Sequence, residues 1–191
     1  MKDLVPLFRI DTISRREISR GKVWKDAKKH YEQTLREMKN NLCNLVYLCA
    51  PLKPTRQKLV QDHIAEAMLT ASQILGAKYN GKKIVLFVPH IHVFSIYNEI
   101  IYPQVRGRAI KFNDRLIRDF FHTLVVVGER ISEGMLSEIN QARKNGTEVV
   151  KMKDFKKKLK NLPNTEKSKK DYRRMVNLHN KIHGSEFSIA L

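Results

Sequence analysis

The chain has 191 residues, 42% of them apolar, and its 37 Lys and Arg against 19 Asp and Glu give a formal net charge of +18. This length suits one domain of ordinary size. No apolar run is long enough to span a bilayer, and no signal-peptide core follows the first residues. We therefore expect a soluble, cytoplasmic protein without a membrane partner. Cys43 and Cys49 are expected to be reduced core residues in that compartment.

The positive charge is concentrated towards the ends of the chain. Residues 151–191 carry 12 basic and 4 acidic side chains, including the run Lys156-Lys157-Lys158. A basic tail attracts polyanions, which favours association with nucleic acid or anionic nucleotides. A solvated helix face that keeps the protein soluble explains the same pattern. The charge alone leaves both interpretations open.

A long amphipathic helix is predicted over residues 14–40. Its apolar stripe includes Ala27, Tyr31, Leu35 and Met38 at helical spacing. Such a stripe needs a partner. The sequence does not decide whether it packs on the core or on a second copy of the chain, and a homo-oligomer follows from the second arrangement.

Strands and helices alternate along the next hundred residues. Apolar, β-branched runs predict strands at residues 45–50, 83–88, 123–127 and 147–150. Helical patterns between them cover residues 56–75, 113–121 and about 135–145. Repeated right-handed crossovers then give an α/β fold, a Rossmann-like three-layer sandwich with a mainly parallel sheet.

This order divides the chain into three parts. An N-terminal helical extension covers residues 1–44, the α/β domain covers 45–150, and a basic helical extension covers 151–191. Within the last part, residues 155–162 and 168–183 are predicted helices separated by Pro163-Asn164. The segment 91–107 fits no regular element and is expected to be a lid-like excursion.

The third predicted strand leads directly into a candidate site. Gly128 ends the apolar run Leu124–Val127, and the polar loop 129–134 opens the following helix. In open α/β sheets, ligands bind just beyond the carboxyl ends of the strands. Residues 129–138 are therefore expected to contact a ligand.

Three segments of the chain, together with three single residues after the last segment, resemble nucleoside 2-deoxyribosyltransferase-like proteins. The likeness is strongest to the uncharacterised branch of that superfamily found in bacteria and phages, whose loop reads much like Gly-Asp-Arg-Ile-Ser-x-Gly-Met. The segments are Val46–Pro51, Val88–His90 and Val127–Met135, followed by Glu138, Ile139 and Gly146. Together they cover about residues 45–150, which leaves the two extensions outside the resemblance.

The resemblance implies a protein that binds a nucleoside or a nucleotide-derived small molecule and cleaves or transfers its N-glycosidic bond. Glu138 matches the nucleophile, Asp114 the aspartate that handles the proton of the base, and Tyr47 the tyrosine that orients the nucleophile. A carboxylate can trap an oxocarbenium-like sugar as an ester, which divides one hard step into two. Relatives are often oligomers that complete a site across an interface.

Candidate ligand-binding residues come from the resembling segments and from cations placed to meet a phosphate. They are Ala50, Pro51, Pro89, His90, Arg106, Arg130, Ser132, Gly134 and Met135. Arg108 and Lys111 lie near Arg106 in the sequence, where a lid would present cations to a phosphate.

Other interpretations of these residues remain. Glu138 is also compatible with a surface glutamate, Asp114 with a helix cap, and Tyr47 with a core aromatic residue. Ser132 stands where the characterised enzymes carry an acid. The alternative function is therefore a noncatalytic module that senses or sequesters a nucleotide, of the kind that phages or mobile elements encode.

The sequence gives no indication of a cofactor or a metal. It contains no Walker loop and no Gly-x-Gly-x-x-Gly fingerprint. His90 and His92 have strand-like spacing, but no Cys or His cluster supplies a third ligand, so a histidine at a binding-site edge or in a turn is favoured over a metal site. We expect neither a metal nor a cofactor.

Overall fold

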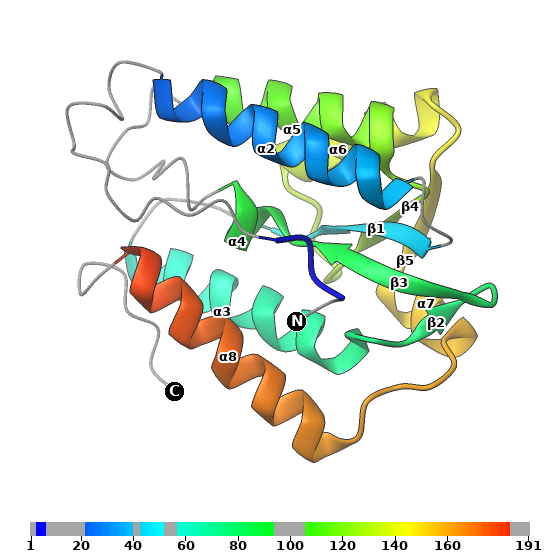
Figure 1. Ribbon diagram of the computed structural model, residues 1–191. Coiled ribbons are helices and arrows are strands. Elements are labelled where there is room, and N and C mark those ends of the chain that lie inside the picture. The colour runs from blue at the N-terminus through cyan, green and yellow to red at the C-terminus, as the bar shows by residue number, and fades with distance from the viewer. Residues whose placement is uncertain (1–2, 7–21, 40–42, 52–56, 94–105, 184–191) are drawn as a thin grey trace.

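A single five-stranded sheet organises the protein. The computed structural model describes residues 3–6, 22–39, 43–51, 57–93 and 106–183 (Figure 1). The strands are β1 (Cys43–Cys49), β2 (Lys78–Tyr79), β3 (Lys82–Phe87), β4 (Thr123–Val126) and β5 (Glu148–Lys151), in the order β2-β3-β1-β4-β5. Four strands are parallel, and the two-residue β2 runs antiparallel to β3.

Helices cover both faces of this sheet. On one face lie α2 (Lys22–Lys39), α5 (Arg106–Phe120) and α6 (Glu133–Lys144). On the other lie α3 (Gln57–Ile74), α7 (Met152–Lys158) and α8 (Thr165–His183). The single turn α4 (Pro89–His92) follows β3 directly. Figure 1 shows α2 and α5 above the sheet and α3 and α8 below it.

The central strand β1 explains why both faces are covered. Leu45, Tyr47 and Cys49 belong to the apolar cluster under α2 and α5, whereas Val46 and Leu48 belong to the cluster under α3 and α8. Successive side chains of a strand point to opposite faces, and all five of these are fully buried. A strand without a polar face can lie only in the middle of a covered sheet.

Helices from both terminal parts of the chain contribute to this core. Ala27, Tyr31 and Leu35 of α2 are buried in the first cluster, so the amphipathic stripe packs on the sheet of its own chain. Met175 and Val176 of α8 are buried in the second cluster, opposite α3. The N-terminal residues 3–6 also pair with β3, through Leu4 and Leu86.

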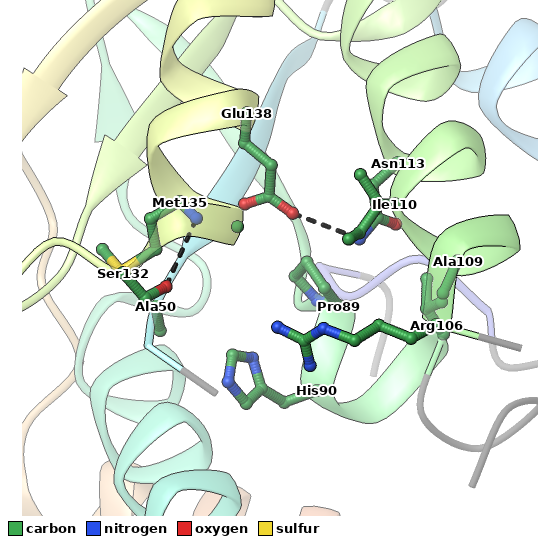
Figure 2. Close-up of a pocket in the computed structure, with 12 residues that line it drawn as sticks. Ala50, Pro89, His90, Arg106, Ala109, Ile110, Asn113, Ser132, Met135 and Glu138 are labelled. Atoms are coloured by element: carbon green, nitrogen blue, oxygen red, sulfur yellow. Dashed lines mark hydrogen bonds between the residues drawn. The ribbon is translucent and has the colours of Figure 1, made fainter. Parts of the chain in front are cut away.

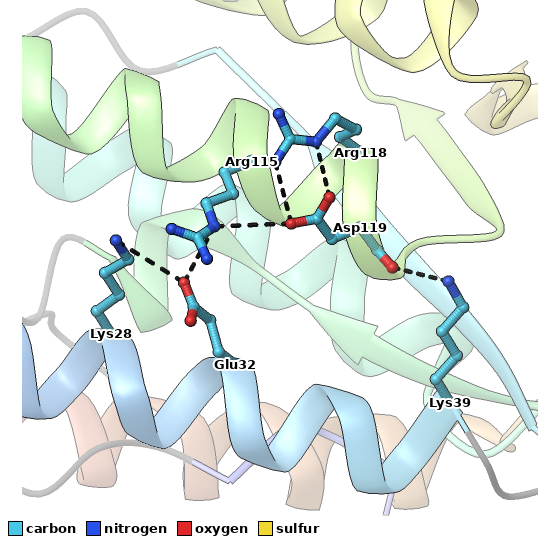
Figure 3. Close-up of polar contacts among 6 residues, drawn as sticks. All are labelled: Lys28, Glu32, Lys39, Arg115, Arg118 and Asp119. Atoms are coloured by element: carbon cyan, nitrogen blue, oxygen red, sulfur yellow. Dashed lines mark hydrogen bonds and ion pairs between the residues drawn. The ribbon is translucent and has the colours of Figure 1, made fainter.

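Polar contacts between α2 and α5 supplement that packing (Figure 3). Arg115 lies 3.3 Å from Glu32, and Lys39 donates to the backbone oxygen of Asp119 at 2.7 Å. Lysine near the last carbonyl groups of a helix is favourable because that end carries partial negative charge. These contacts lie at the surface, where ion pairs contribute little.

The α/β class and the mainly parallel sheet are confirmed, and four expected strands are present within one or two residues of their predicted ends. Two helices differ clearly. The helix predicted over residues 155–162 was wrong at both ends, because α7 spans Met152–Lys158 and Lys160 pairs with Lys78 of β2 instead. The prediction of a helix over residues 113–121 was wrong at its start, because α5 begins at Arg106. Gly107 is tolerated in the first turn, and Ala109 and Phe112 bury the same face as Leu116. Asn113 therefore lies inside a helix and does not cap one.

One strand of the sheet has no counterpart among the predicted elements. The short β2 was not predicted, because its two residues carry no hydrophobic pattern of their own. The predicted lid segment 91–107 and the first part of the predicted helix 14–40 lie largely outside the described residues. Within the part of the chain that the structure describes, no helix has the length and apolar character of a membrane span.

Candidate functional site

A small cavity lies where the carboxyl ends of β1, β3 and β4 meet. Its volume is about 60 Å³. Its lining comes from the residue after β1, from α4, from α5 and from the start of α6 (Figure 2), and comprises Ala50, Pro89, His90, Val93, Arg106, Ala109, Ile110, Asn113, Ser132, Gly134, Met135 and Glu138. In this sheet β1 lies between β3 and β4. The connection after β1 runs to β3 on one side, and the connection after β3 runs to β4 on the other side of β1. Ligands of α/β proteins bind at the strand ends where the order reverses in this way.

Glu138 is the chemical centre of the cavity. Oε1 of Glu138 accepts a hydrogen bond from the hydroxyl of Tyr47 at 2.6 Å and another from Nδ2 of Asn113 at 3.1 Å. The thiol of Cys49 also hydrogen bonds to this carboxyl. Tyr47 of β1 and Asn113 of α5 therefore hold the same oxygen of the carboxyl. The other oxygen, Oε2, takes part in neither of these two hydrogen bonds.

Loss of hydration alters the acidity of this cluster. Burial raises the pKa of Glu138 to about 7, although the hydrogen bonds from Tyr47, Cys49 and Asn113 oppose the rise and the nearby charge of Asp114 adds to it. Burial and the neighbouring carboxyl raise the pKa values of Tyr47 and Cys49 well above their ordinary ranges. Near neutral pH, Glu138 is therefore present in both its protonated and its ionised form, whereas Tyr47 and Cys49 keep their protons and remain hydrogen-bond donors.

The start of α6 holds Glu138 in place. Ser132 caps the helix, because its hydroxyl accepts from the backbone amide of Met135 at 3.3 Å. Gly128 lies two residues after the end of β4 and has a φ of +81°, a conformation that residues with a side chain rarely adopt. Met135 and Ile139 pack the apolar face of α6 against the sheet. Glu138, the residue before Ile139, then points towards α5, where Asn113 donates to it.

His90 forms the opposite wall from Glu138 (Figure 2). It is buried, and its Nε2 lies 3.1 Å from the carbonyl oxygen of Pro51, which can only accept. The proton of the neutral ring is therefore on Nε2, and Nδ1 has no hydrogen-bond partner among the described residues. Burial lowers the pKa of His90 to about 4, so the ring is neutral near pH 7.

The structure brings most of the predicted site residues together. Tyr47 is connected to the cavity by its hydrogen bond to Glu138, and Pro51 by its hydrogen bond with His90. The predicted residues that line the cavity itself are Ala50, Pro89, His90, Arg106, Ser132, Gly134, Met135 and Glu138.

Asp114 and Arg130 lie elsewhere. Asp114 does not line the cavity and hydrogen bonds to Ser137, and burial raises its pKa. Arg130 is exposed in the loop before α6 and is also absent from the lining. Arg108 and Lys111 are exposed on α5, away from Arg106. The expected ligand loop thus contributes through its last residues only.

A metal does not fit the described side chains. His92 lies in the apolar core beside Phe87, with Nε2 2.9 Å from the carbonyl oxygen of Val5, so His90 and His92 do not converge. No group of three or more His, Cys, Asp or Glu side chains within the described ranges is placed to hold an ion.

A family model described as "Domain of unknown function (DUF7768)" matches residues 44–152, which is more than half of the chain. The chain belongs to this family. Comparisons with curated proteins and with solved structures gave no match. The matched range runs from β1 to the first residue of α7, so it contains every residue that lines the cavity of this DUF7768 domain.

Sequence reasoning missed four lining residues of the DUF7768 domain: Val93, Ala109, Ile110 and Asn113. Asn113 is the most consequential, because it donates directly to Glu138. A signal for it was present in the spacing. Ala109, Ile110 and Asn113 lie three, four and seven positions after the predicted Arg106, which places all four on one helix face. The wrong start of α5 concealed that relation.

Proposed function

We propose that the DUF7768 domain binds a nucleoside or nucleotide and cleaves or transfers its N-glycosidic bond, with Glu138 as nucleophile. The observation that carries the proposal is the Glu138 carboxyl in the strand-end cavity, with one oxygen held by Tyr47 at 2.6 Å and Asn113 at 3.1 Å. A carboxylate held by two donors on one side is oriented for reaction on the other.

The reaction has two steps. The ionised Glu138 carboxylate forms a bond to the anomeric carbon as the carbon–nitrogen bond breaks, and the base leaves with the bonding electrons and takes up a proton. Water, or the nitrogen of a second base, then attacks the same carbon, loses a proton to solvent and releases the carboxylate. With a pKa of about 7, Glu138 is substantially ionised at neutral pH and ready for the first step.

Tyr47 and Asp114 act on that carboxyl in different ways. Tyr47 donates to it, which fits the orienting role that the resemblance implies. Asp114 contributes negative charge that raises the pKa of Glu138. Its transfer of a proton to the base stays a prediction, since Asp114 lies outside the cavity lining.

The volume of the cavity restricts how such a ligand binds. About 60 Å³ is far below the ~300–1,000 Å³ of pockets that enclose whole ligands of drug size. We propose that only the reacting part of the sugar enters, between Glu138 and His90, and that the base and any phosphate remain at the mouth. Arg106 lies on the lining, where its guanidinium can meet a phosphate.

The resemblance to nucleoside 2-deoxyribosyltransferase-like proteins belongs to the same proposal. The proposal also includes a finer fold assignment, a Rossmann-like three-layer sandwich, and a cytoplasmic location. Helices on both faces of a mainly parallel sheet support the fold assignment, and the position of Glu138 after β4 supports the likeness.

Release of free base from a panel of nucleosides, nucleotides and dinucleotides tests the enzyme proposal, with chromatography as the readout. We expect the parent protein to release base from at least one compound and Glu138→Ala to lose turnover while it keeps its circular dichroism spectrum. Glu133→Ala is the matched control, because Glu133 is exposed on the same helix and outside the cavity. A Glu138→Ala protein as active as the parent contradicts the assignment.

The second candidate function is a noncatalytic module that senses or sequesters a nucleotide. Ser132 favours it, because this residue is engaged as the helix cap at the position where the characterised enzymes carry an acid. A rise in melting temperature with one compound of the panel, without release of base, supports this function. Release of base by the parent protein counts against it.

A further inference from the structure

A second hollow lies away from the candidate site, between α3 and α8. This groove encloses about 580 Å³, and its described lining residues are all different from those of the cavity around Glu138. Its lining comes from the end of α3, from α7, from the loop after α7 and from the first half of α8, and comprises Leu69, Gln73, Lys156, Leu162, Pro163, Thr165, Ser168, Lys169, Tyr172 and Arg173.

The floor of the groove is unusually apolar for a surface. Among the described residues, four large apolar side chains are about half exposed, and Leu69 and Leu162, at 47% and 49%, are two of them. Tyr172 lies beside them and packs partly against the core. Single exposed leucines are ordinary, but two that face one groove with a tyrosine and a proline indicate a contact surface.

The rim of the groove is positive. Lys156, Lys169 and Arg173 line it, and among the described residues no carboxylate does. Lys156 bonds to the neutral Gln73 at 2.8 Å, and Lys169 pairs with the outlying Glu166 at 3.1 Å. The amino end of α8, capped by Asn164, opens at Thr165 and adds the partial positive charge of a helix start.

The walls that shape the groove are fixed by the fold. The loop before α8 is joined to β2 by two backbone hydrogen bonds between Lys78 and Lys160, of 2.8 and 2.9 Å. Phe155 of α7 is fully buried against Tyr79, and Met175 of α8 is fully buried in the core. A groove with rigid walls loses little conformational freedom when it is filled.

We propose that this groove is the docking site for an acidic segment of a partner protein that inserts a large apolar side chain between Leu69 and Leu162. The partner's carboxylates then meet Lys156, Lys169 and Arg173 on the rim. An apolar floor inside a charged rim is the usual anatomy of a peptide-binding groove. A phosphate backbone fits it less well, because leucine and proline offer nothing to phosphate. A second copy of this strongly basic chain would bring positive charge against positive charge.

Selection from a displayed library of random peptides tests the proposal with the whole chain as bait. We expect the enriched peptides to carry Asp or Glu next to Leu, Ile, Phe or Trp. Binding measured by fluorescence anisotropy should weaken about tenfold or more in Leu162→Asp and in Arg173→Glu. Both positions are exposed, so these variants are expected to fold, which circular dichroism checks.

Matched variants separate the groove from general charge. Leu136→Asp changes an equally exposed leucine on α6, and Arg174→Glu changes the arginine next to Arg173 outside the groove. Both should bind the selected peptides as the parent does. The proposal is wrong if no peptides are enriched, if the enriched peptides lack acidic residues, or if Leu162→Asp binds them normally. It is also wrong if a single-stranded RNA oligonucleotide binds the parent and loses its affinity in Leu162→Asp, because the groove is then a nucleic-acid surface.

Discussion

Glu138 combines several hydrogen-bond donors with a raised pKa. Three donors surround its carboxyl, yet burial still raises its pKa to about 7. In the ionised form this carboxylate costs stability, because hydration is lost and the hydrogen bonds restore only part of it. Residues that cost stability are typical of functional sites, where activity requires a group that the fold would not otherwise keep.

This cost predicts the effect of Glu138→Gln on stability. The folded-state pKa, about 7, lies above the ordinary value of 4.5, so the folded state holds the proton more tightly and stability falls as pH rises between those values. Glutamine has no charge to bury. We expect Glu138→Gln to melt about 2–4 °C above the parent at about pH 8, with the difference shrinking towards about pH 5.

Differential scanning calorimetry across this pH range measures the effect. Glu133→Gln, an exposed change on the same helix, should follow the parent curve. A Glu138→Gln protein that melts below the parent at about pH 8 would mean that the ionised carboxylate stabilises the fold.

Tyr47→Phe should make Glu138 a weaker acid. The tyrosine hydroxyl donates to Oε1 at 2.6 Å, and this bond favours the ionised form. Carbon-13 NMR of the Glu138 carboxyl should therefore show a higher pKa in Tyr47→Phe. Tyr79→Phe is the matched control, since Tyr79 donates to Glu148 at the same distance of 2.6 Å but lies away from the cavity. An unchanged titration in Tyr47→Phe rejects this hydrogen bond as a determinant.

The candidate site illustrates which residues the sequence can locate. Glu138, Ser132 and Met135 follow one strand in sequence, so the rule that ligands bind at strand ends was enough to place them. Asn113 and Ala109 reach the cavity from α5, more than twenty residues earlier in the chain. The spacing places these residues on one helix face with Arg106, but only the packing of α5 against α6 brings that face to Glu138.

At the scale of elements, α2 shows which interactions hold a helix on the sheet. Tyr31 is fully buried, its ring contacts Phe87 edge-on, and its hydroxyl donates to the backbone oxygen of His92 at 3.0 Å. The next residue, Glu32, forms a surface ion pair with Arg115 (Figure 3). Apolar burial is worth several times more than such a pair.

Two substitutions at neighbouring positions test that ranking. Tyr31→Ala should lower the free energy of unfolding by about 3–5 kcal/mol, because it leaves a cavity and an unpaired carbonyl. Glu32→Gln should change it by less than about 1 kcal/mol. Urea denaturation followed by circular dichroism compares the two. If the two variants lose similar stability, the ion pairs and not the apolar face attach α2.

The elements also show the limits of pattern reading. Continuous apolar runs identified β1, β3 and β4, because strands buried on both faces have no polar positions. The start of α5 was missed because Gly107 and the charged residues around it hide the apolar face that begins at Ala109. The two residues of β2 are set by their pairing with β3, which is a tertiary effect.

At the scale of the whole molecule, the packing of α7 and α8 affects how the basic tail is studied. Phe155, Met175 and Val176 are fully buried, so removal of residues 151–191 would take away core side chains as well as charge. Association with nucleic acid through this region is better tested by reversing exposed charges such as Lys170 and Arg174. Loss of binding in these variants, with the melting temperature unchanged, supports the association.

Stability should also depend on pH through the buried histidines. Burial lowers the pKa values of His90 and His92 to about 4, below the ordinary value of 6.5. The unfolded chain therefore binds more protons between these values, and stability falls as pH decreases from about 6.5 to about 4. We expect the melting temperature of the parent to fall over this range, and that of His92→Gln to fall less steeply. Parallel curves for the two proteins contradict the role of His92.

The most direct test of the central claim is to detect the sugar attached to Glu138. Protein incubated with the nucleoside and nucleotide panel is quenched with acid, digested and analysed by mass spectrometry. The account predicts a glycosyl ester on the peptide that contains Glu138 in the parent, and neither ester nor released base with Glu138→Gln. Release of base at equal rates by the parent and Glu138→Gln would show that Glu138 is not the nucleophile.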